Sequence, residues 1–140
     1  TRLKEAYDDF LLVTNRFKGS KYAEDASNRL IFLRDSMAKH EVYVASYYLK
    51  RGAYLASSER SKYMLEKYPG APATKDALII LIESYNKLEM IDLAKSTADV
   101  LSQNFSNYSY MINENKMVII KDSTKKDVIE KKSFFDLGLF

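Results

Sequence analysis

Few side chains in this sequence have the type and spacing that catalysis requires. His40 is the only histidine among 140 residues, and there is no cysteine. A Ser-His-Asp triad needs a nucleophile and a carboxylate that converge on one imidazole, but Lys39 and Glu41 flank His40 in a helical pattern, where adjacent side chains point apart. Without cysteine, thiolate nucleophiles, disulfides and Cys-based zinc sites are excluded. The sequence therefore predicts no catalytic residue, no metal site and no cofactor.

The charged residues do not form a pattern typical of nucleic-acid binding. Twenty-two Lys and Arg against 19 Asp and Glu give a net charge of +3, which is small for that class of protein. Tyrosines and basic residues interleave from Tyr47 to Arg51, an arrangement that could stack on a single strand. However, these tyrosines coincide with positions expected to pack between helices, and Glu59 and Glu66 dilute the charge. We expect no nucleic-acid partner.

Apolar residues recur at helical spacing along most of the chain. Gly19 ends the first pattern, and the second meets no Gly or Pro before Gly52, which predicts one long helix. The third stops at Pro69, and Thr74 is expected to be the N-cap of the next. The predicted helical segments are 2–17, about 22–51, 54–68 and a helical hairpin over 75–104.

The sequence contains an internal repeat. Residues 47–70 align with residues 84–107 at a constant offset of 37, so that Tyr48 matches Tyr85 and Glu89 stands where the first copy has Gly52. Two antiparallel helices per repeat, with aromatics wedged between hairpins, resemble the tetratricopeptide repeat. We therefore predict an all-α fold, a right-handed superhelical stack of such hairpins with one elongated helix. The structural repeat positions are Tyr48, Gly52, Tyr54, Pro69 and Tyr85.

The expected organisation is a repeat region over 1–106 and an extension over 107–140. The segment 1–17 corresponds to half a repeat, so we expect a longer helical solenoid of which this is the C-terminal part. The extension is predicted to be partly helical, with a short helix from Thr124 to Lys132. Its apolar end, Phe134 to Phe140, is expected to cap the stack or to meet a partner or a membrane surface.

A helical solenoid normally binds other proteins with its curved face. The inner face comes from the first helix of each hairpin, and the residues expected there are Val42, Ser46, Leu49, Lys50, Ile79, Glu83, Asn86 and Lys87.

A resemblance to a known family makes this expectation specific. The long helix running into YYLKRGAY, the following Glu59-Arg60 pair and the turn YPGAPAT are similar to the C-terminal half of the BamD family. These tetratricopeptide lipoproteins belong to the BAM complex, which assembles β-barrels in the bacterial outer membrane. The resemblance implies a non-catalytic scaffold on the periplasmic face of the outer membrane, held by a lipid anchor upstream of this sequence.

The resemblance also implies the partners. They are the periplasmic POTRA region of BamA and other BAM subunits, with unfolded outer-membrane protein as a further candidate. In the family an arginine of the second hairpin helix reaches a carboxylate of BamA, and Arg60 is the matching position. The alternative for Arg60 is an exposed cation worth under ~1 kcal/mol. The predicted partner-binding residues are Arg60, Arg51, Glu59 and Lys50.

A second function stays open on the sequence alone. Another periplasmic repeat adaptor, which coordinates cell-envelope or peptidoglycan proteins, would show the same helical hairpins.

Overall fold

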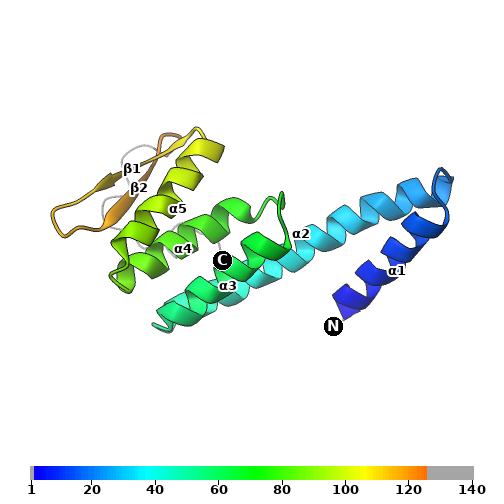
Figure 1. The fold of residues 1–140 in the computed structure, drawn as a ribbon, viewed down its shortest axis with the longest axis horizontal. Coiled ribbons are helices and arrows are strands. Elements are labelled where there is room, and N and C mark those ends of the chain that lie inside the picture. The colour runs from blue at the N-terminus through cyan, green and yellow to red at the C-terminus, as the bar shows by residue number, and fades with distance from the viewer. Residues whose placement is uncertain (1, 126–140) are drawn as a thin grey trace.

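The computed structural model describes residues 2–125 of the chain. Within these residues five helices lead into one antiparallel β-hairpin (Figure 1). The predicted helical stack is confirmed, and the second helix is unbroken. The elements are α1 (Arg2–Arg16), α2 (Lys21–Lys50), α3 (Tyr54–Lys67), α4 (Thr74–Lys87), α5 (Ile91–Asn104), β1 (Tyr108–Ile112) and β2 (Val118–Asp122).

Two expectations about local structure differ from the fold. The β-hairpin was not predicted, because its strands are short and carry no turn signal such as Asn-Gly. Thr74 is not the N-cap of α4: Ala73 holds that position, and Thr74 is the first helical residue. The helix predicted from Thr124 to Lys132 and the apolar Phe134 to Phe140 lie outside the described residues, apart from Thr124 and Lys125.

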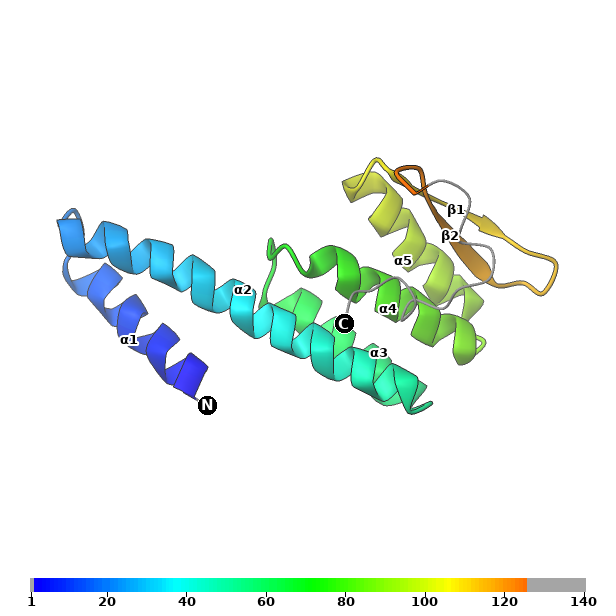
Figure 2. The ribbon, with the colours of Figure 1, turned by 180° about the vertical axis from the view of Figure 1, so that it is seen from behind.

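Helix α2 is the longest helix of the described residues and contacts α1, α3 and α4. Each helix packs against the next one in the chain, and α2 also contacts α4. Helix α1 lies along the N-terminal half of α2, α3 and α4 pack beside its C-terminal half, and α5 packs on α4 (Figure 1 and Figure 2). The N-terminal half of α2 and α1 therefore form an arm that projects from the rest of the stack.

The two halves of α2 bury different faces. In the arm the buried residues are Ala23, Ala26 and Leu33, whereas the C-terminal half buries Ala38, Val42 and Ala45 among others. Each set follows helical spacing, but the second set does not continue the phase of the first. The N-terminal half of α2 therefore packs against α1 with one face, and its C-terminal half packs against α3 and α4 with another. Its 30 residues provide both contacts.

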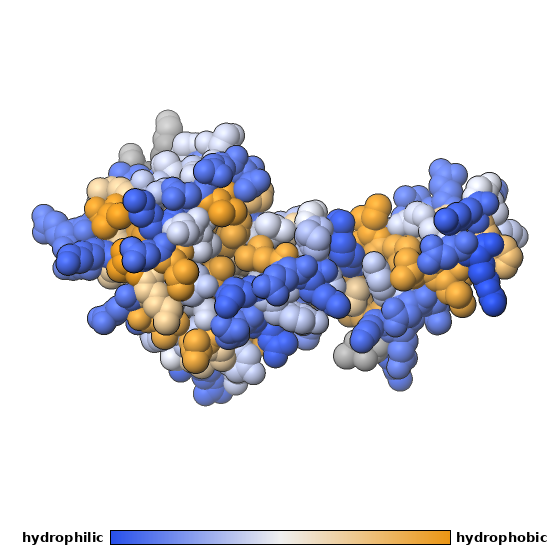
Figure 3. All heavy atoms as spheres, viewed as in Figure 1, coloured by the Kyte–Doolittle hydropathy of each residue, from blue (hydrophilic) through white to orange (hydrophobic). Residues whose placement is uncertain are grey.

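The side chains of the arm are less buried than those of the helical stack. Within the described residues α1 buries no side chain, and Leu12, Ile31 and Phe32 are exposed. Apolar side chains are accordingly visible on the surface of the arm (Figure 3). Helix α1 therefore depends mainly on its contact with α2, and most of the buried core lies in α2–α5.

Small residues let α3 pack closely between α2 and α4. Ser57 is fully buried, and its Oγ donates a hydrogen bond to the Ala45 carbonyl oxygen of α2 at 2.8 Å. The single hydroxyl hydrogen of Ser84 in α4 is shared by Ser57 Oγ at 3.1 Å and the Ile80 carbonyl oxygen of its own helix at 2.8 Å. One turn further along α3, Ser61 is also fully buried, but its Oγ has no hydrogen-bond partner among the described residues. At the level of Ser57, hydroxyl groups therefore link all three helices. One turn further along α3, the hydroxyl group of Ser61 is left unpaired.

This difference predicts opposite effects for two similar substitutions. Ser61→Ala removes an unpaired buried hydroxyl and should raise the free energy of unfolding by about 1 kcal/mol. Ser57→Ala is the control: it removes a paired hydroxyl and should lower the free energy of unfolding by about 1 kcal/mol. Urea denaturation measures both. Equal destabilisation by the two substitutions would contradict the hydrogen-bond assignment.

The β-hairpin covers the last helical hairpin. Val118 is buried against α4 and α5. The Asn86 side chain of α4 pairs with the Val118 backbone, donating to its carbonyl oxygen at 2.9 Å and accepting from its N–H at 3.0 Å. Tyr110 donates a hydrogen bond to Asp99 of α5. The β-hairpin is thus fastened to both helices.

Half of the eight residues predicted for the inner face are buried or engaged within the protein itself. Val42, Ser46 and Leu49 lie in the interior, because α4 and α3 pack on the C-terminal half of α2. The side chain of Asn86 is hydrogen-bonded to the backbone of β2. The expectation that these four residues line an open binding face is wrong.

The turns after α2 and α4 correspond to each other, as the offset of the internal repeat predicts. Gly52 follows α2 with a φ of 77°, and Glu89, 37 residues later, follows α4 with a φ of 59°. Both residues adopt the left-handed conformation that suits glycine and strains other residues. The second copy has therefore kept the backbone of the turn without its glycine.

Glu89→Gly should therefore relieve this strain and raise the free energy of unfolding by about 1 kcal/mol. Gly52→Ala is the matched control and should lower it by about 1 kcal/mol through backbone strain alone, since an added Cβ would come no closer than 4.0 Å to another side chain. Thermal unfolding measured by circular dichroism checks both. A loss of stability for Glu89→Gly would contradict the shared turn.

Candidate partner-binding surface

Arg60 lies on the outer side of α3 and forms an ion pair with α2. Its Nη1 is 3.2 Å from Oε2 of Glu41. The Arg60 side chain is 41% exposed, whereas Glu41 is only 14% exposed. Because the two residues come from neighbouring antiparallel helices, the ion pair fixes the guanidinium relative to the hairpin. Arg60 is therefore a surface residue that is held from one side.

Glu59 does not share this environment. Its Oε1 lies 3.2 Å from Nζ of Lys62, three residues further along α3, and its side chain is 62% exposed. A hydrogen bond from Lys62 to Glu59 raises the pKa of the Lys62 ammonium above its usual value. Adjacent residues of a helix point apart, so Glu59 and Arg60 do not form one recognition group.

Arg51 belongs to a group of aromatic residues at the end of α2. It is the C-cap residue of this helix, and its guanidinium carbon lies 5.2 Å from the centre of the Tyr47 ring. Tyr47 in turn meets Tyr48 edge to face, with 6.0 Å between ring centres. Lys50, the last residue of α2, is exposed. Both predicted basic residues thus lie at the surface where α2 ends.

Tyr63 is a surface aromatic that the sequence analysis did not select. It follows Arg60 by three residues, so the two side chains are neighbours on α3, and it is 44% exposed. Its ring meets that of Tyr68 edge to face at 6.5 Å. Burial raises the pKa of the half-buried Tyr68 hydroxyl. The i, i+3 spacing from Arg60 was the signal available in the sequence.

Two groups of residues lie on the α2–α3 hairpin, Glu41, Arg60 and Tyr63 in one and Tyr47 and Arg51 in the other, and we call them together the α2–α3 flank. Glu41 and Tyr48 lie seven residues apart on the same face of α2. The Arg60–Glu41 ion pair and the Tyr47–Tyr48–Arg51 group thus lie at two separate levels of α2. The structure brings Arg60 and Arg51 onto this flank and leaves Glu59 outside it.

The repeat positions have packing or turn roles. Tyr85 is buried in the core between α4 and α5, and Tyr54 packs half-buried against the α2–α4 core. Tyr48 is half-buried, and Gly52 makes the turn between α2 and α3. Pro69 is exposed just after α3.

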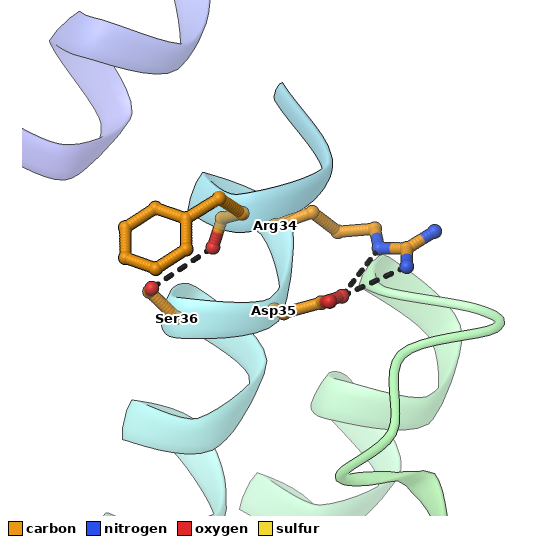
Figure 4. A network of polar contacts seen from close by, with 4 residues as sticks. Arg34, Asp35 and Ser36 are labelled. Atoms are coloured by element: carbon orange, nitrogen blue, oxygen red, sulfur yellow. Dashed lines mark hydrogen bonds and ion pairs between the residues drawn. The ribbon is translucent and has the colours of Figure 1, made fainter. Parts of the chain in front are cut away.

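A second polar contact lies where α2 passes the turn between α3 and α4. Asp35 Oδ1 accepts hydrogen bonds from Nε and Nη2 of Arg34 at 2.9 and 2.8 Å (Figure 4). The Arg34 side chain reaches Gly70 in that turn, where an added Cβ would lie 3.8 Å from Nη1. The position of the turn relative to the long helix could not be predicted from the sequence, because it depends on how α3 packs against α2.

The described residues were also considered as metal ligands and as membrane-spanning helices. Over residues 2–125 no group of three His, Cys, Asp or Glu side chains is placed to hold a metal ion. His40 is exposed on α2. Within the same range no helix is long and apolar enough to cross a membrane.

Stacked antiparallel helical hairpins with matching turns at Gly52 and Glu89 define a helical-repeat protein of the tetratricopeptide-like class. Residues 1–101 match the family described as YfiO, outer membrane lipoprotein, and the chain belongs to this family. The match ends within α5, so the β-hairpin lies beyond it.

Curated relatives carry the name outer membrane protein assembly factor BamD. The protein from Neisseria gonorrhoeae is 39% identical over 108 residues, which are 77% of this chain and 40% of that relative. The Pasteurella multocida protein is 37% identical over 102 residues, or 73% of this chain and 39% of the relative. The Haemophilus influenzae protein is 33% identical over 104 residues, or 74% and 40%. The chain thus spans about two fifths of the length of these relatives.

Proposed function

We propose that the protein is a non-catalytic scaffold in outer-membrane protein assembly, on the periplasmic face of the outer membrane. The names of the relatives as outer membrane protein assembly factors support this role. The description of the family as outer membrane lipoproteins supports the location. Its partners are the POTRA region of BamA, further BAM subunits and, as a candidate cargo, unfolded outer-membrane protein.

In this proposal the α2–α3 flank binds the POTRA region, and Arg60 is its central contact. The observation that carries the proposal is the half-exposed guanidinium held on a rigid helical hairpin. Arginine and tyrosine are enriched among residues that dominate binding energy at interfaces, and Tyr63 and Tyr47 accompany Arg60 and Arg51 here. Arginine also matches a carboxylate with two parallel hydrogen bonds.

Charge reversal at Arg60 tests this assignment. Arg60→Glu should weaken binding to the POTRA region by at least about 2 kcal/mol, since it replaces attraction to a carboxylate by repulsion. Isothermal titration calorimetry gives the affinity, and circular dichroism should show the helices retained despite the loss of the ion pair with Glu41.

The control is Lys62→Glu, which reverses a charge on the same helix at an exposed residue paired with Glu59. It should change the affinity by less than about 1 kcal/mol. Equal affinities for Arg60→Glu and the unchanged protein would remove Arg60 from the interface. Equal losses of affinity for both variants would mean that the effect comes from the net charge and not from a contact of Arg60.

A further inference from the structure

The Arg60 guanidinium is engaged on one side only. Nη1 carries the hydrogen bond to Glu41, while among the described residues Nε and Nη2 have no hydrogen-bond partner. These two nitrogens form an edge of the guanidinium that can donate two parallel hydrogen bonds to one carboxylate. Since the side chain is 41% exposed, Arg60 combines an internal anchor with an unused bidentate edge.

A carboxylate from a partner could meet Arg60 in two ways. It could displace Glu41 from the guanidinium, or it could bind the unused edge while Glu41 stays in place. Displacement would leave the Glu41 carboxylate 86% covered, and within residues 2–125 no other cation lies within ion-pair distance of it. A buried charge that loses its partner costs more than an exposed ion pair contributes. The geometry therefore favours sharing over displacement.

We infer that Glu41 is a positioning residue for partner binding: it holds Nη1 of Arg60 so that the Nε–Nη2 edge faces outward to receive a carboxylate of the partner. This inference rests on the proposed function of the α2–α3 flank. Glu41 contributes by orienting the arginine before binding, because ordering a long side chain at an interface otherwise reduces the affinity. Its negative charge is not what the partner recognises.

Two substitutions separate orientation from charge. Glu41→Ala removes the acceptor for Nη1 and should weaken POTRA binding about five-fold, the cost of ordering one arginine side chain. Glu41→Gln keeps an acceptor oxygen without the charge and should bind within about two-fold of the unchanged protein. Glu66→Ala, at an exposed residue of α3, is the matched control and should have no effect. Calorimetry on the full protein measures all three, with thermal melts to check folding.

A fourth variant, Arg60→Ala, separates this inference from the proposed function. In the Arg60→Ala background Glu41→Ala should cause no further loss, because it acts only through the arginine. If Arg60→Ala weakens binding but Glu41→Ala binds as tightly as the unchanged protein, or more tightly, the partner displaces Glu41 and the inference is overturned. It is also overturned if Glu41→Gln is as weak as Glu41→Ala. If Arg60→Ala itself binds normally, the proposed contact fails and the inference fails with it.

Discussion

The close approach of α2, α3 and α4 is the constraint on which the rest of the structure depends. It requires small residues where the helices meet, and Ala38, Ala45 and Ser57 are all fully buried there. Interiors are packed to near-crystalline density, so larger side chains at these positions would push the helices apart. The hydroxyl groups of Ser57 and Ser84 add hydrogen bonds across the same contact. Helix α3 is thereby fixed along its length between two neighbours.

The functional surface follows from this packing. Because Ser57, Ser61 and Met64 point into the stack, Arg60 and Tyr63 lie on the remaining side of α3. Glu41 on α2 then comes within reach of the Arg60 guanidinium. A binding group on two packed helices keeps its geometry better than one on a loop. The β-hairpin meanwhile covers α4 and α5, whereas the arginines and tyrosines of the α2–α3 flank stay at the surface.

Helical periodicity was sufficient to predict the helices, because apolar spacing and the glycines after α1 and α2 are local signals. The offset between the repeats correctly related Glu89 to Gly52. The β-hairpin was missed, since its strands depend on Asn86 and Val118, which are 32 residues apart. The inner face was misjudged for a similar reason: Val42 and Leu49 are buried by helices that only the tertiary arrangement brings to α2. Arg60 was selected through the family resemblance, whereas its pairing with Glu41, 19 residues away, required the structure.

Chemical-shift mapping tests the central claim most directly. Amide resonances of the isotopically labelled protein are followed while the unlabelled POTRA region of BamA is added. The largest changes are expected on the outer side of α3 around Arg60 and Tyr63 and at Glu41 of α2, with small changes in α1 and in β1 and β2. Changes confined to the β-hairpin or to the arm, with the α3 resonances unaltered, would contradict this expectation.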